Sequence, residues 1–98
     1  MGFTEIPSQK LEDLVTFPVL IPVKAVSQKN IDEAEFRAAV YAVTREHVTT
    51  FLEEHISIRV SSAGSYYSAT LMITFEHVDQ VYAVDAALRA HPLVLRVL

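Results

Sequence analysis

The sequence contains no cysteine and no tryptophan, and only two of its 98 residues are glycine. Without cysteine, the chain cannot form a disulfide, a thiol nucleophile or a thiolate metal site. A net charge of −4 argues against a general nucleic-acid or anionic-membrane binder. The densest apolar stretch, FPVLIPVKAV, is too short to span a bilayer, and no signal-peptide pattern precedes it. These absences favour a soluble cytoplasmic protein.

Apolar residues alternate with their neighbours in four segments, at about 17–25, 56–60, 66–75 and 93–98, which predicts four strands. Between them, apolar residues recur at helical spacing over about 31–54 and 77–90. The order βαββαβ predicts an α+β fold, the ferredoxin-like sandwich, in which two helices cover one face of a four-stranded antiparallel sheet. We expect residues 1–15 to be a flexible N-terminal lead-in and residues 16–98 to form a single domain.

Local signals refine these elements. Pro18 and Pro22 remove backbone donors, so the start of the first strand should be irregular or unpaired on one side. Asn30 with Glu33, or Asp32 with Glu35, has the spacing of a helix capping box. Pro92 should end the second helix.

Strand alternation assigns side chains to faces. It predicts that Leu71, Ile73 and Phe75 lie beneath the helices. In the last strand it predicts two opposite sets, Leu93, Leu95 and Val97 on one face and Val94, Arg96 and Leu98 on the other.

The five residues SSAGS, 61–65, join the second and third strands. Their composition fits a hairpin turn in which Gly64 has a positive φ angle. A phosphate-binding loop would contain more glycine and would be followed by a helix, whereas a strand follows here. We therefore favour a turn over a ligand loop.

Three stretches resemble a known family. FPVLIPVKAV contains its Phe-Pro start and strand lysine, SSAGSYYSATLMI contains its Ser-Ser-x-Gly-x-Tyr-x-Ser hairpin, and HVDQV matches the start of its second helix. The chain thus resembles the YbeD-like bacterial proteins. This family is catalogued as lipoic-acid-binding regulators, and its fold is similar to that of ACT domains. The resemblance implies this fold and a link to lipoate, and it carries over no catalytic residue. Ser27 stands where that family has glycine, and Arg96 is in a different register from its last-strand arginine.

The residue types that could carry catalysis are scattered. The four histidines fit a half-buried position or helix ends better than a metal site, since no carboxylate–histidine cluster surrounds them. No histidine and acid converge on one serine hydroxyl by spacing. An RNA-recognition sheet would need two or three aromatic residues where only Tyr66 is available. We expect no enzyme activity, no metal and no cofactor.

The same alternation places three cations, Lys24, Arg59 and Arg96, on the sheet face without helices. They could be an ordinary solvated surface, or they could bind an anionic ligand or partner. The predicted surface comprises Lys24, Arg59, Tyr66, Ser68, Met72 and Arg96, beside Leu20, Val94 and the hairpin residues Ser61, Ser62 and Gly64. We expect a non-catalytic regulatory or ligand-binding module, and the family resemblance implies a carboxylate ligand such as lipoate or its carrier protein. The alternative is an interaction module that dimerises or docks a protein through this face.

Overall fold

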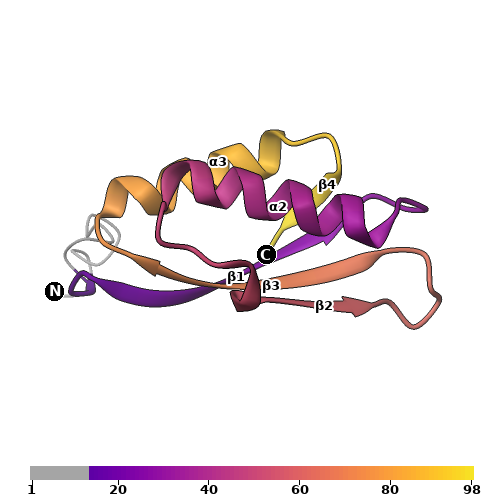
Figure 1. Ribbon diagram of the computed structural model, residues 1–98, viewed down its shortest axis with the longest axis horizontal. Helices are drawn as coiled ribbons and strands as arrows, with labels where there is room; N and C mark the ends of the chain where they lie inside the picture. Colours follow the sequence, from indigo (N-terminus) through magenta and orange to yellow (C-terminus); the bar gives the residue numbers. More distant parts are fainter. Residues whose placement is uncertain (1–13) are drawn as a thin grey trace, which may run out of the picture.

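Two helices lie above a four-stranded sheet in the computed structural model, which describes residues 14–98 (Figure 1). The elements are β1 (Val19–Ser27), α2 (Glu33–His47), the 3-10 helix η2 (Glu53–His55), β2 (Ile56–Val60), β3 (Tyr67–Phe75), α3 (Val78–Ala90) and β4 (Val94–Val97). The predicted ferredoxin-like βαββαβ order is confirmed. The expected lead-in at 1–15 lies almost entirely outside the described residues. No helix within residues 14–98 is long and apolar enough to cross a membrane.

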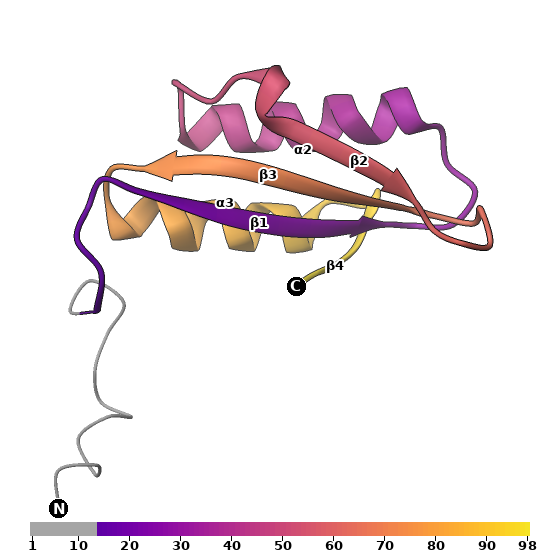
Figure 2. The ribbon, with the colours of Figure 1, turned by 90° about the horizontal axis from the view of Figure 1, so that it is seen from below.

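The sheet has the strand order β2-β3-β1-β4, and each neighbouring pair is antiparallel. Figure 2 shows the strands in front of both helices, so α2 and α3 cover the same face. We call the other side, which no described helix covers, the open face.

The core lies between the sheet and the helices, as alternation predicts. Leu71, Ile73 and Phe75 of β3 are fully buried, whereas the intervening Met72 and Thr74 are exposed. The helices contribute buried side chains at helical spacing, namely Phe36 and Val40 from α2 and Val84 and Leu88 from α3. Burial of this apolar surface is the main favourable contribution to folding.

The first strand is paired on one side over most of its length. It pairs with β3 from Val19 to Val26, but β4 joins it only from Ala25 onwards. The backbone oxygen of Lys24 accepts from Leu98 N at 2.8 Å, so even-numbered residues of β1 direct their backbone groups towards the β4 side. Pro22 shares this parity, and its missing donor therefore faces the unpaired side. The predicted one-sided pairing is confirmed.

The first helix is shorter than predicted. Asp32 caps it, since Asp32 Oδ2 accepts from Glu35 N at 3.1 Å, and the helix ends at His47 rather than near residue 54. β-branched residues at 48–50 lower helix propensity here. Phe51 continued the apolar spacing in the sequence, but it reaches the core, with 2% exposure, from the turn after the helix.

The predicted faces of the last strand were wrong at two positions. Val94 is buried at 4% exposure, whereas Leu95 is 46% exposed. The reason is a register shift, because Ser27 pairs with Val94 and Val26 pairs with Arg96, which leaves Leu95 as an extra residue. A bulge of this kind reverses the alternation on one side of it. Val97 is buried and Arg96 exposed, as predicted.

Candidate functional site

One residue from each strand forms a straight row across the open face. Strand pairing sets Arg59 of β2 opposite Ser68 of β3, Ser68 opposite Val26 of β1, and Val26 opposite Arg96 of β4. Neighbouring strands lie about 4.8 Å apart, so the α-carbons of the two arginines lie about 14 Å apart. The row therefore has a guanidinium group at each end and two small neutral side chains between them.

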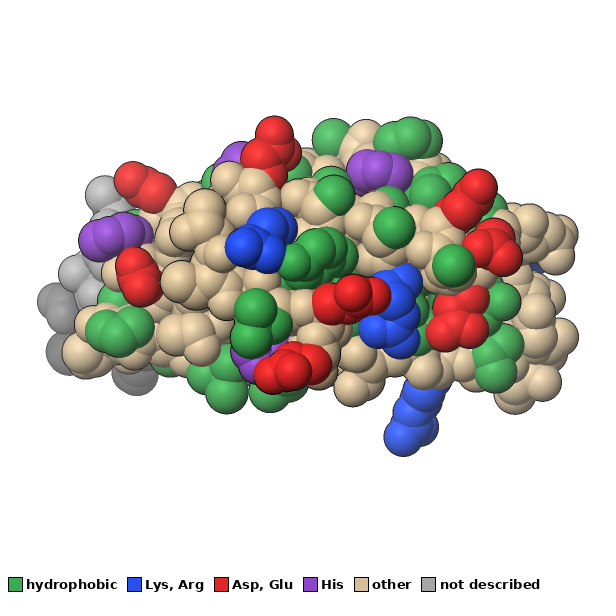
Figure 3. All heavy atoms as spheres, viewed as in Figure 1, with side chains coloured by type: hydrophobic (Ala, Val, Ile, Leu, Met, Phe, Trp, Pro, Cys, Tyr) green, Lys and Arg blue, Asp and Glu red, His purple; other side chains and the backbone are tan. Residues whose placement is uncertain are grey.

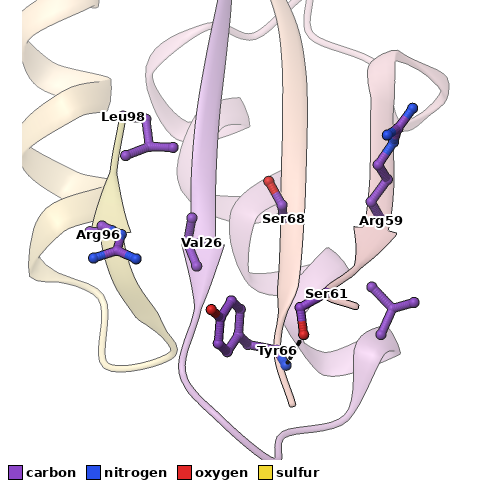
Figure 4. Close-up of a pocket in the computed structure, with 8 residues that line it drawn as sticks. Val26, Arg59, Ser61, Tyr66, Ser68, Arg96 and Leu98 are labelled. Atoms are coloured by element: carbon purple, nitrogen blue, oxygen red, sulfur yellow. Dashed lines mark hydrogen bonds between the residues drawn. The ribbon is translucent and has the colours of Figure 1, made fainter. Parts of the chain in front are cut away.

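A hollow of about 420 Å³ lies over this row. Its lining is mainly apolar and consists of Val26, Arg59, Val60, Ser61, Tyr66, Ser68, Arg96 and Leu98. Figure 4 shows the Tyr66 ring turned towards Val26, with Arg96 on one side of the hollow and Arg59 on the other. The volume is in the range of small-molecule sites, which is roughly 300–1,000 Å³. We call this feature the open-face hollow.

The sheet and the helical layer differ in their acidic residues. The described strands carry Lys24, Arg59 and Arg96 and contain no aspartate or glutamate. In Figure 3, acidic side chains are spread over the helical layer, and a basic side chain projects below the sheet. The ion pair within residues 14–98 joins Arg89 to Asp85, and none of the three strand cations has such a partner there. The open face is thus locally positive although the whole chain is acidic.

The predicted surface residues separate into two groups. Arg59, Tyr66, Ser68 and Arg96 come together in the lining of the hollow. Lys24 and Met72 are exposed, and the alternation of their strands places them on the open face, but outside the lining. Lys24 lies two residues before Val26, while Met72 pairs with Pro22 farther along the sheet. Val94 does not belong to this surface, because it is in the core.

The sequence prediction did not include Val26, Val60 or Leu98 in the surface. It did place Leu98 on the same face of its strand as Arg96. Alternation along β1 could have found Val26, because it has the same parity as Lys24. Val60 is 58% exposed on an edge strand, although alternation assigns it to the helix side, and the sequence carries no signal for this position.

The hairpin is a turn, as predicted. Gly64 has a φ angle of +75°, and its N–H donates to Ser61 O at 2.8 Å. The Ser61 hydroxyl accepts from Ser65 N at 3.1 Å and from Tyr66 N at 3.4 Å. The hydroxyl of Ser61 therefore holds the turn together and fixes the backbone of Tyr66 at the rim of the hollow. Ser62 is exposed and lies outside the lining.

The histidines take the structural positions that the sequence favours. His47 is half-buried at the end of α2, and His77 and His91 flank α3. His91 Nδ1 accepts from Leu93 N at 3.1 Å, while His47 O accepts from Gln80 Nε2 at 3.2 Å. Among residues 14–98, no three histidine, aspartate or glutamate side chains are grouped to hold a metal ion.

A second depression, of about 260 Å³, lies between β1 and α3 where β4 stops short. Among the described residues that line it, Asp85 alone is charged, and its Oδ2 lies 2.9 Å from Arg89 Nε. Because that charge already has a counter-ion, the depression offers less for ligand recognition than the open-face hollow, where neither arginine has an ion-pair partner among residues 14–98.

Comparison with known proteins places the chain in a family. The family model described as "Protein of unknown function (DUF493)" matches residues 12–98. The chain belongs to this family. A UPF0250 protein of Neisseria gonorrhoeae is 34% identical over 85 residues, covering 87% of this chain and 90% of the relative. A UPF0250 protein of Chromobacterium violaceum is 29% identical over 91 residues, covering 93% and 99%.

A third relative, the UPF0250 protein of Paraburkholderia phymatum, is 32% identical over 90 residues, covering 89% of this chain and 94% of the relative. These matches confirm the resemblance to the YbeD-like bacterial proteins. The names of the DUF493 family and of its UPF0250 relatives state no activity. No solved structure matches the chain.

Proposed function

We propose that this DUF493-family domain is a non-catalytic regulatory module that binds a carboxylate ligand in its open-face hollow. The observation that carries the proposal is the pair of arginines, Arg59 and Arg96, in register at the two ends of an apolar hollow. Neither has an acidic partner within residues 14–98. Arginine presents a planar fork of donors that fits a carboxylate, and such charge-assisted hydrogen bonds are stronger than neutral ones.

The rest of the lining suits a ligand that is part hydrocarbon. Val26, Val60 and Leu98 offer apolar contact, while Tyr66 and Ser68 bring hydroxyl groups. A few polar groups in an apolar hollow are the usual composition of a small-molecule site. Lipoate, which the YbeD-like resemblance implies, is a carboxylate on a hydrocarbon chain and is the first ligand to test.

Among residues 14–98, the side chains that line the hollow include no general base, which favours binding without reaction. They include no histidine, aspartate or glutamate, and the Ser61 hydroxyl already accepts two backbone hydrogen bonds. A serine nucleophile requires an adjacent base to accept its proton.

Calorimetric titration with lipoate tests the proposal. We expect the wild type to bind and the double variant Lys24→Glu/Arg59→Glu to lose binding, with affinity falling as salt rises. The control Lys29→Glu/Arg89→Glu makes the same change in net charge at exposed residues that do not line the hollow. Equal affinity of the wild type and the Lys24→Glu/Arg59→Glu variant would contradict carboxylate binding at the open face.

The alternative is a protein-interaction module, and exposed apolar side chains favour it. Leu20 is 54% exposed and Met72 is 36% exposed, and both belong to the open face. Exposed apolar groups on one face can mark a protein-binding surface. A second copy docking face to face would set its cations against Lys24, Arg59 and Arg96, so this alternative favours an acidic partner. It predicts that Leu20→Ser/Met72→Ser abolishes capture of that partner without changing lipoate affinity.

A further inference from the structure

We infer that the ligand of the open-face hollow carries two anionic groups, one for Arg59 and one for Arg96. The inference rests on the proposed function and specifies the chemical class of its ligand. It begins with the row Arg59–Ser68–Val26–Arg96, whose charged ends are separated by three strand spacings, or about 14 Å between α-carbons.

The two guanidinium groups do not converge on one point. In Figure 4 the Arg59 side chain runs along β2 away from Tyr66, and the Arg96 side chain lies over β4. A single carboxylate that pairs with one of them therefore leaves the other without a counter-charge. A ligand that fills the hollow also removes water from both groups, and removing water from an unpaired charge is unfavourable. A dianion neutralises both cations and avoids this cost, so a monocarboxylate such as lipoate should bind more weakly than a dianion.

The middle of the row has room for a chain that joins the two anionic groups. The open-face hollow of about 420 Å³ lies over Ser68 and Val26, which are opposite each other between the arginines. Ser68 is small, and Val26 is only 6% exposed. The hydroxyl groups of Ser68 and Tyr66 make no hydrogen bond to other residues within 14–98, so they can contact the linking chain. Lys24 lies on the same face of β1, two residues before Val26, and it adds positive potential without lining the hollow. A dicarboxylate of intermediate length meets all these conditions.

The experiment compares suberate with octanoate, which has the same number of carbons but a methyl group in place of the second carboxylate. Octanoate offers more hydrocarbon, so a preference for suberate must come from the second charge. Calorimetry on the wild type should give roughly fivefold tighter binding of suberate, since a solvent-exposed ion pair contributes up to about 1 kcal/mol. Arg59→Gln and Arg96→Gln should each remove that preference. Arg89→Gln, the same change in the helical layer, should retain it.

Each outcome decides the matter once melting curves show that the variants are folded. Equal affinities of the wild type for the two acids would overturn the dianion inference and leave carboxylate binding intact. A suberate preference that persists in both Arg59→Gln and Arg96→Gln would also overturn it, since the second charge would then bind elsewhere. Failure of both acids and of lipoate to bind would overturn the proposed function itself.

Discussion

Leu71→Ala should destabilise the domain strongly, because Leu71 lies at the centre of the core. Its side chain is fully buried, and its strand partners are Val23 of β1 and Ile56 of β2. Strands on both sides limit how far the surroundings can collapse into the space left by truncation. Buried leucine-to-alanine changes cost about 2–5 kcal/mol, and poor collapse places this one at about 3–4 kcal/mol. For a domain of this size, that corresponds to a fall in Tm of roughly 12–30 °C.

Urea unfolding followed by circular dichroism measures the change directly. The midpoint should fall at an unchanged slope, since the same surface is exposed on unfolding. Leu95→Ala is the matched control, because it makes the same chemical change at a side chain that is 46% exposed. We expect the control to cost less than about 1 kcal/mol. A loss within about 0.5 kcal/mol for Leu71→Ala, or a larger loss for Leu95→Ala, would refute the assignment of the sheet faces.

Three further changes test local features by the same urea unfolding. Gly64→Val should cost at least about 1–2 kcal/mol because of the positive φ angle, whereas Gly64→Asn should cost less; equal losses would contradict strain at the turn. Asp32→Ala should cost about 1 kcal/mol and Asp32→Asn less, and no difference would mean that this side chain does not cap α2. Val94→Ala should cost about 2 kcal/mol, more than Leu95→Ala although leucine is larger, and the reverse order would exclude the bulge in β4.

The faces of β3 could be predicted from the sequence because one period of alternation runs through the whole strand. Leu71, Ile73 and Phe75 share a parity, and that parity determines which side of the sheet they occupy. The bulge at Leu95 could not be predicted in this way. It depends on how β4 meets the end of β1, a contact between segments far apart in the chain.

The end of α2 shows a second limit of the sequence pattern. Phe51 continues the helical spacing of apolar residues, and it is buried as that spacing requires. A helix and a turn can each bring this side chain to the core. The spacing of apolar residues therefore did not indicate that the helix stops at His47. The residues of low helix propensity at 48–50 were the available signal.

For the candidate site, alternation predicted which cations share the open face but not which of them meet. Arg59, Ser68, Val26 and Arg96 form one row because of the pairing registers of three strand pairs. The β2–β3 register follows from the hairpin, whereas the registers of β1 with β3 and with β4 depend on tertiary packing. Alternation therefore predicted that Lys24 and Met72 lie on the open face, but it could not show that they lie outside the hollow, because that depends on the pairing registers.

A map of amide chemical-shift changes, recorded while suberate is added to the ¹⁵N-labelled wild-type protein, tests the central claim most directly. Carboxylate binding in the open-face hollow predicts changes concentrated at Val26, Arg59, Ser68 and Arg96 that reach saturation and weaken as salt is raised. The amides of α2 and α3 that face away from the sheet should stay unchanged. Changes centred on those helices, or no saturable change at the four strand residues, would contradict the claim that the open face is a carboxylate-binding site.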